Sequence, residues 1–196
     1  MRRRLAIAGW LAVPFLLAGF HYYGPGERWK DLDDTARILR EADAHAAAEQ
    51  WQEAVEKYGL AMERLPADRV DQIRHARLAK DRARMFIGQL PQAHDDLEAM
   101  MEELARDPKA EPAMVDETRR EYANSQYYMT WLYRLEGQPE TEWKPFIEGA
   151  RQNFKLLAEG TKDPAATNLL KEDLDSSIRL ARMDLNELQA LPLPSQ

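Results

Sequence analysis

The segment AVEKYGLAMERLP, residues 54–66, decides how the chain folds. Ala54, Tyr58 and Ala61 recur at the spacing of one helical face, so the segment predicts a helix with a buried stripe. The small side chains of Ala54 and Ala61 let another helix approach closely, and Tyr58 fills the space between them. Pro66 ends the helix because proline has no amide hydrogen to donate. A face of this kind requires a packed helix on each side.

Length and composition indicate one folded domain with a tail or an anchor. The chain has 196 residues, of which 44% are hydrophobic and 31% are charged, as in ordinary globular proteins. It contains no cysteine, which excludes disulfides, thiolate zinc sites and cysteine nucleophiles. The net charge is −7, so we expect no nucleic-acid partner.

The first 23 residues predict a membrane anchor. Three arginines, Arg2 to Arg4, precede an uncharged run, residues 5–20. As a helix, residues 5–23 would span roughly 28 Å, close to the thickness of a hydrocarbon core. The arginines predict a single-pass protein of the bacterial inner membrane, with a cytoplasmic N-terminus and a periplasmic domain. A cleaved secretory signal and a buried helix are the alternatives.

The rest of the chain predicts helices and no strand. Residues 24–32 are predicted as a linker, residues 33–190 as a helical domain and residues 191–196 as a proline-containing tail. The tail is either a frayed end or a short extended ligand for a partner. The seven predicted helices are 33–48, 51–64, 68–87, 91–106, 112–136, 141–159 and 164–190.

The first six predicted helices pair into three hairpins, and the second helix of each hairpin repeats one pattern. A small residue is followed by a bulky residue four positions later and by a third apolar residue three positions after that. The triplets are Ala54/Tyr58/Ala61, Ala93/Leu97/Met100 and Ala150/Phe154/Leu157. The uneven spacing of the triplets indicates that the loops and first helices differ in length.

These hairpins resemble tetratricopeptide repeats (TPRs) over residues 35–160. The first hairpin carries the resemblance best, with Ala42, Trp51, the 54–66 segment and its closing proline. The second keeps Gly88, Leu90 and its triplet, but Asp81 stands where a small residue is expected. The third matches at Met129, Thr130, Tyr133 and Gly137, and departs through a longer loop that contains Trp143 and Pro145. A helical bundle without true repeats is the alternative.

The resemblance implies an all-α fold in which three hairpins form a right-handed solenoid closed by a C-terminal capping helix. The last predicted helix has one apolar side, as a cap requires. Its apolar residues are Leu170, Leu174, Ile178, Ala181, Leu185 and Leu188.

No pattern in the sequence predicts catalysis, a metal or a cofactor. The histidines lie at positions 21, 45, 75 and 94, and no two have the spacing of metal ligands. Phosphate-binding loops and nucleophile motifs are absent from the sequence. We therefore expect a protein that is not an enzyme.

A run of basic residues marks the third predicted helix. One interpretation is a solvated face paired with acids of neighbouring helices, and the other is a docking strip for an acidic partner. The residues are Arg69, Arg74, Arg77, Lys80, Arg82 and Arg84.

The TPR resemblance implies a peptide groove along the first helix of each hairpin. Leu39 and Asp43 stand where the family's clamp for terminal carboxylates needs a lysine and an asparagine, so we exclude that activity. The aromatic residues among the groove positions fill the core or contact a ligand. The implied groove residues are Leu39, Asp43, His75, Arg82, Phe86, Asn124, Tyr127 and Trp131.

Together these features predict a membrane-tethered TPR-like scaffold that binds a protein or peptide without catalysis. The membrane contact would be made by residues 5–23. The alternative is a structural accessory subunit of a larger membrane protein complex.

Overall fold

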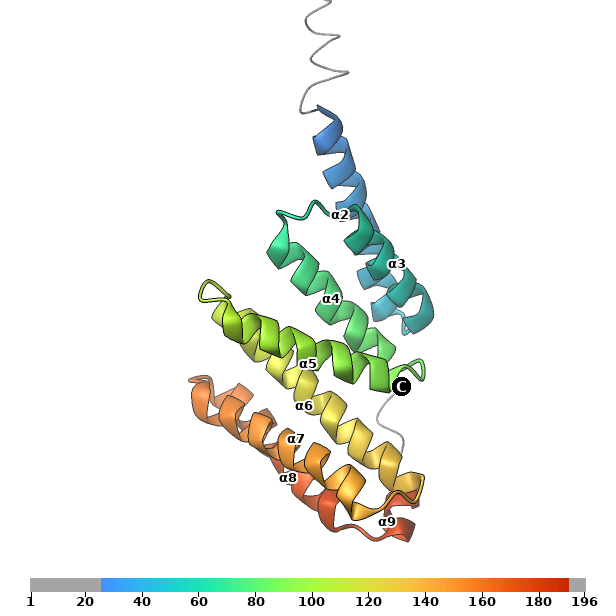
Figure 1. Cartoon of the computed structure of the whole chain (residues 1–196), viewed down its shortest axis with the longest axis vertical. Coiled ribbons are helices and arrows are strands. Elements are labelled where there is room, and N and C mark those ends of the chain that lie inside the picture. The colour runs from blue at the N-terminus through green and yellow to red at the C-terminus, as the bar shows by residue number, and fades with distance from the viewer. Residues whose placement is uncertain (1–25, 191–196) are drawn as a thin grey trace, which may run out of the picture.

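The computed structural model describes residues 26–190, all of whose regular structure is helical. Figure 1 shows the helices as antiparallel neighbours stacked along the long axis, from α2 and α3 at one end to α7, α8 and α9 at the other. Their bounds are α2 Gly26–Ala47, α3 Trp51–Arg64, α4 Val70–Arg84, α5 Leu90–Arg106, α6 Pro112–Leu135, α7 Glu140–Gly160, α8 Pro164–Arg182 and α9 Leu185–Ala190. The all-α prediction is confirmed for this part of the chain.

Three hairpins, α2/α3, α4/α5 and α6/α7, bury the same positions of their second helices. Every member of the three predicted triplets is at most 6% exposed. Burial of an alanine at the start of each triplet permits close helix packing, and the bulky second member fills the space beside it. The sequence pattern therefore identified the packed face of α3, α5 and α7.

The first helices of the three hairpins also share an equivalent buried position. Ala42 on α2, Asp81 on α4 and Thr130 on α6 are each 0% exposed. Seven residues after each of them, the backbone adopts a positive φ, at Glu49 (58°), Gly88 (73°) and Gly137 (72°). A left-handed residue at this place ends a helix and lets the chain turn back.

Asp81 is fully buried, although α4 and α5 are in less extensive contact than the two helices of either other hairpin. Its carboxylate accepts a hydrogen bond from Arg84 Nη1 at 3.0 Å, and the same nitrogen lies 2.5 Å from Asp96 on α5. Burial and the nearby Asp96 carboxylate raise the pKa of Asp81 to about 6. The expected small residue is thus replaced by a charged cluster.

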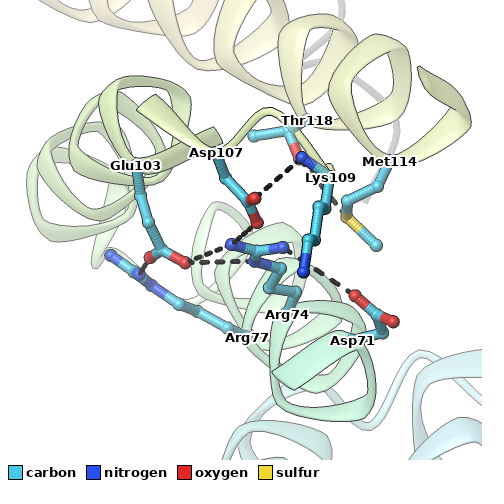
Figure 2. Close-up of polar contacts among 8 residues, drawn as sticks. All are labelled: Asp71, Arg74, Arg77, Glu103, Asp107, Lys109, Met114 and Thr118. Carbon is cyan, nitrogen blue, oxygen red and sulfur yellow. Dashed lines mark hydrogen bonds and ion pairs between the residues drawn. The ribbon is translucent and has the colours of Figure 1, made fainter. Parts of the chain in front are cut away.

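A second charged cluster ties α4 to the end of α5. The Arg74 side chain is only 9% exposed, and it pairs with Glu103 at 3.0 Å and with Asp107 at 2.9 Å. Figure 2 shows these carboxylates converging on Arg74, with Asp107 also accepting a hydrogen bond from the backbone of Lys109. Met114 lies beside this cluster at the start of α6. Arg74 therefore fixes the position at which the chain turns from α5 into α6.

The C-terminal helices, from α7 onward, differ from their prediction in two ways. Trp143 and Pro145 lie in α7 and not in a loop. Pro145 is the sixth residue of the helix, so α7 continues through a proline that cannot donate to the carbonyl of Thr141. The predicted helix 164–190 is also divided into α8 and α9. Asp184 and Glu187 exchange side-chain hydrogen bonds with each other's backbone amides at 2.8 and 2.9 Å. This capping box begins a new helix.

Close packing of α6 on α7 depends on Gly149. A Cβ atom at this position would lie 2.5 Å from Gln126 Nε2. Gln126 in turn accepts a hydrogen bond from Asn153 at 3.1 Å. At the end of the stack, Leu170 of α8 packs with Phe154 and Leu157 of α7, and thereby extends the core to α8.

The predicted localisation in the inner membrane is contradicted by the described structure. Across residues 26–190, the structure contains no helix that combines the length and the apolar character needed to cross a bilayer. The predicted anchor, residues 1–23, and the tail, residues 191–196, lie outside the described residues. Part of the predicted linker is helical, because α2 begins at Gly26. Membrane attachment plays no part in the function proposed for this chain.

Candidate interaction surface

The first helices of the hairpins, with α8, line two adjoining clefts. The cleft between α2 and α4, here named the α2–α4 cleft, has a volume of about 340 Å³. Its apolar floor comes from Leu39, Ala76, Leu78 and Ala79. Its polar lining consists of Asp43, Tyr58, Gln72, His75, Arg82 and Glu117.

The second cleft, here named the α6–α8 cleft, has a volume of about 410 Å³. It is more strongly charged than the first, and residues of four helices and of the turn after α7 line it. They are Arg82, Ala113, Asp116, Glu117, Arg120, Glu121, Leu157, Thr161 and Leu170. Because Arg82 and Glu117 belong to both clefts, the two form one surface, which we call the first-helix face.

The bridge between the two clefts is an ion-pair cluster. Arg82 of α4 lies 3.1 Å from Glu117 and 2.8 Å from Glu121, both on α6. Asn124 donates a further hydrogen bond to Glu121 at 3.2 Å. Glu117 and Glu121 lie four residues apart on one side of α6, so a single guanidinium reaches both carboxylates.

Tyr58 of α3 also lines the α2–α4 cleft. Its ring is buried, and its hydroxyl donates to Asp43 at 2.7 Å. Burial and this hydrogen bond to Asp43 raise the pKa of Tyr58. The hydroxyl therefore stays protonated and holds the exposed Asp43 carboxylate at the cleft edge.

The first-helix face carries an excess of negative charge. Four carboxylates line the clefts, from Asp43, Asp116, Glu117 and Glu121, against two guanidinium groups, from Arg82 and Arg120. Asp173 of α8 adds a partly buried carboxyl whose pKa is raised by burial and lowered in part by Arg120.

Half of the implied groove residues lie together. Leu39, Asp43, His75 and Arg82 all line the α2–α4 cleft. Asn124 lies beside them through its bond to Glu121. The TPR resemblance thus pointed to residues of three different helices that the structure brings onto one face.

The three aromatic residues of the implied groove pack against other helices. Phe86 stacks on Trp51, with ring centroids 4.5 Å apart. Tyr127 and Trp131 contact the apolar cluster formed by Ile147, Leu180 and Leu188. Core filling, which the sequence left open for these aromatic residues, is the role their surroundings favour.

The six basic residues of the predicted docking strip do not form one free surface. Arg74, Arg77, Arg82 and Arg84 each pair with carboxylates of α5 or α6. Their charges are therefore largely neutralised, as the solvated-face interpretation requires. Lys80 is half-buried and Arg69 is exposed at the start of α4.

His94 lies in a packed environment. It stacks on Tyr122 with ring centroids 5.2 Å apart, and its Nδ1 lies 3.1 Å from Ser125 Oγ. Burial lowers the pKa of His94. Within residues 26–190, no group of three or more potential ligands is arranged to hold a metal ion.

Comparison with known proteins adds no family to this description. Neither protein-family models, nor curated proteins, nor solved structures match the chain. The first-helix face therefore rests on the geometry of this chain alone.

Sequence reasoning missed the residues that α6 contributes to the first-helix face. Asp116, Glu117, Arg120 and Glu121 line a cleft, yet none belonged to the implied groove. The spacing of Glu117 and Glu121 was a usable signal. Residues four positions apart place both carboxylates on one side of α6, where one arginine of α4 can pair with them.

Proposed function

We propose that this chain is a TPR-like, non-catalytic scaffold whose first-helix face binds a protein partner. The observation that carries the proposal is the pair of adjoining clefts lined by α2, α4, α6 and α8. Residues from successive first helices meet there, as in a groove that receives an extended or helical segment.

The repeated positions of the hairpins support the TPR-like interpretation. Ala42, Asp81 and Thr130 are buried alike, and each is followed by a left-handed turn at the same distance. The triplets of the second helices are buried alike as well. A bundle without true repeats would have no reason to keep the same distance from the buried position to the left-handed turn in all three hairpins.

The surface chemistry supports binding over catalysis. The polar groups of the first-helix face pair with one another, as in the Arg82 bridge to Glu117 and Glu121. The exposed cleft edges offer a histidine, two further carboxylates and an apolar floor. Such mixed lining provides specificity for a side-chain pattern in a partner.

An accessory subunit of a larger complex is the second candidate, and it has its own observation. Leu156 on α7 and Leu169 on α8 are 54% and 57% exposed, and large apolar side chains at this exposure mark contacts with other chains when they form a patch. Replacing both with serine would remove such a contact. If the second candidate holds, the double variant Leu156→Ser/Leu169→Ser is absent from a complex that contains the wild-type protein.

Site-specific crosslinking tests the proposed function. Because the chain has no cysteine, His75→Cys provides a single attachment point for a photoreactive probe in the α2–α4 cleft. Ala99→Cys, exposed on α5, provides the matched control. We expect a discrete crosslinked partner from residue 75 in a cell extract, suppressed by unlabelled wild-type protein. Equal crosslinking of that partner from both positions would contradict the proposal.

A further inference from the structure

The carboxylates of the first-helix face differ in how well they are neutralised. Glu117 and Glu121 share Arg82, at 3.1 and 2.8 Å. Arg120 interacts with Asp173 of α8. Of the two cations of the clefts, Arg82 is therefore already paired with acids of the protein itself.

Two carboxylates remain without a cation. Asp43 is exposed and accepts only the neutral hydroxyl of Tyr58. Asp116 is exposed on α6. Neither forms an ion pair with any residue in the described range 26–190. One lines each cleft, so they stand on opposite sides of the Arg82 bridge.

The floor between the bridge and α2 is apolar. Leu39, Ala76 and Ala79 line the α2–α4 cleft, and Leu39 and Ala79 are partly exposed. The small alanine side chains leave room for a side chain of the partner. Binding is favoured when the apolar atoms of that side chain are removed from water. The cleft is therefore suited to an aliphatic side chain beside a positive charge.

We infer that the partner segment is a basic peptide, whose lysine or arginine side chains pair with Asp43 and Asp116 and whose aliphatic side chain enters the α2–α4 cleft. This inference rests on the proposed function. An acidic peptide or a nucleic acid would meet an excess of carboxylates on the face. A second copy of this chain would bring a net charge of −7 to it.

Selection from a random linear peptide library, displayed and panned on the immobilised full-length protein, provides the probe. We expect selected peptides to be enriched in lysine or arginine next to leucine, isoleucine or valine. Two variants with the same change in net charge are then compared. Asp43→Asn/Asp116→Asn neutralises the first-helix face, and Glu53→Gln/Glu63→Gln neutralises exposed carboxylates of α3.

The dissociation constant of a selected, fluorescently labelled peptide separates the two variants. Two exposed ion pairs contribute enough for about a tenfold loss of affinity in Asp43→Asn/Asp116→Asn. We expect less than about a twofold change in the α3 control, and weaker binding to the wild type as salt increases. Equal losses in both variants would show that only bulk charge attracts the peptide, and would overturn the inference.

A blocking variant distinguishes failure of this inference from failure of the proposed function. Ala79→Gln fills the cleft floor without changing its charge. If Ala79→Gln lowers the melting temperature, His75→Trp blocks the cleft from an exposed position instead. Selected peptides that lack basic residues but no longer bind the blocked protein would overturn the inference alone. Peptides that bind the blocked and wild-type proteins equally would overturn both proposals.

Discussion

The first and second hairpins bury the equivalent position of their first helices with opposite chemistry. In the first, Ala42 of α2, Ala54 and Tyr58 of α3 and Ala83 of α4 form an apolar cluster. In the second, the position equivalent to Ala42 is Asp81, and Arg84 donates from one nitrogen to both Asp81 and Asp96. Both contacts exclude water completely at the equivalent position.

The difference shows that one position of this architecture can hold either a small residue or a carboxylate. A buried carboxylate is tolerated only when a cation lies within hydrogen-bond reach. Arg84 supplies that cation one helical turn after Asp81. The corresponding position after Ala42 is His45, whose ring nitrogen lies 2.6 Å from Gln50. The first hairpin therefore has a histidine, already engaged with Gln50, at the position where the second hairpin has its arginine.

Exchanging the two chemistries should have the largest effect. Ala42→Asp places a carboxylate in the apolar cluster without a cation, and we expect it to lower the free energy of unfolding by about 3–5 kcal/mol. Asp81→Ala leaves Arg84 paired with Asp96, so we expect a change within about 1 kcal/mol at pH 7. Urea unfolding monitored by circular dichroism measures both. Similar losses in the two variants would show that the positions are not equivalent.

Removing the cation of the second hairpin should have the next largest effect. Arg84→Met keeps the aliphatic length but strands the fully buried Asp81, so we expect a loss of about 3 kcal/mol. The double variant Arg84→Met/Asp81→Asn should regain most of this loss because no buried charge remains. If the double variant is as unstable as Arg84→Met, the ion pair is not what stabilises this contact.

The pH dependence of stability should separate the two hairpins through Asp81. Its folded pKa of about 6 lies above the unfolded value of 3.8, so the native state retains a proton that the unfolded state has lost. The contribution of Asp81 to stability is therefore full below pH 3.8 and is lost as pH rises through 6, by at most about 1.4 kcal/mol per pH unit.

Asp81→Asn should remove this slope, as measured by unfolding at a series of pH values. His94 acts in the opposite direction, because burial lowers its pKa and its contribution is lost as pH falls below 6.5. His94→Gln removes this opposing contribution, so the pH dependence due to Asp81 should be steeper in that control variant. An unchanged pH profile in Asp81→Asn would show that the Asp81 carboxyl titrates normally.

The turns of the two hairpins should show the smallest effect. Glu49 and Gly88 occupy equivalent left-handed positions, with φ of 58° and 73°. We expect Glu49→Gly to raise the free energy of unfolding and Gly88→Ala to lower it, each by about 1 kcal/mol. Open space surrounds the position of a Cβ atom at Gly88, so the backbone conformation alone is tested. Shifts in the same direction in both variants would contradict the equivalence.

The helices and the packed face of the second helices could be predicted from the sequence because both depend on local patterns. Small and bulky residues at helical spacing identified the buried triplets, and Pro66 and Gly88 marked where helices end or turn. The break between α8 and α9 was missed because an apolar stripe continues through it. Its signal is the polar capping box of Asp184 and Glu187.

The candidate site could be predicted only in part, because pairing across helices has no local pattern. Leu39, Asp43, His75 and Arg82 were assigned from the resemblance and lie in one cleft. Phe86, Tyr127 and Trp131 were assigned by the same reasoning, yet their rings pack against neighbouring helices. Whether an aromatic side chain faces a cleft or the core depends on the tilt of the next helix, which the spacing of residues does not encode.

Amide hydrogen exchange of the protein with and without a selected peptide tests the central claim most directly. Binding on the first-helix face should slow exchange in α2, α4 and α6 around Asp43, His75 and Glu117, and should leave the exposed sides of α3 and α5 unchanged. Slowed exchange confined to α3, α5 and α7 would contradict the claim that the first helices of the hairpins form the binding surface.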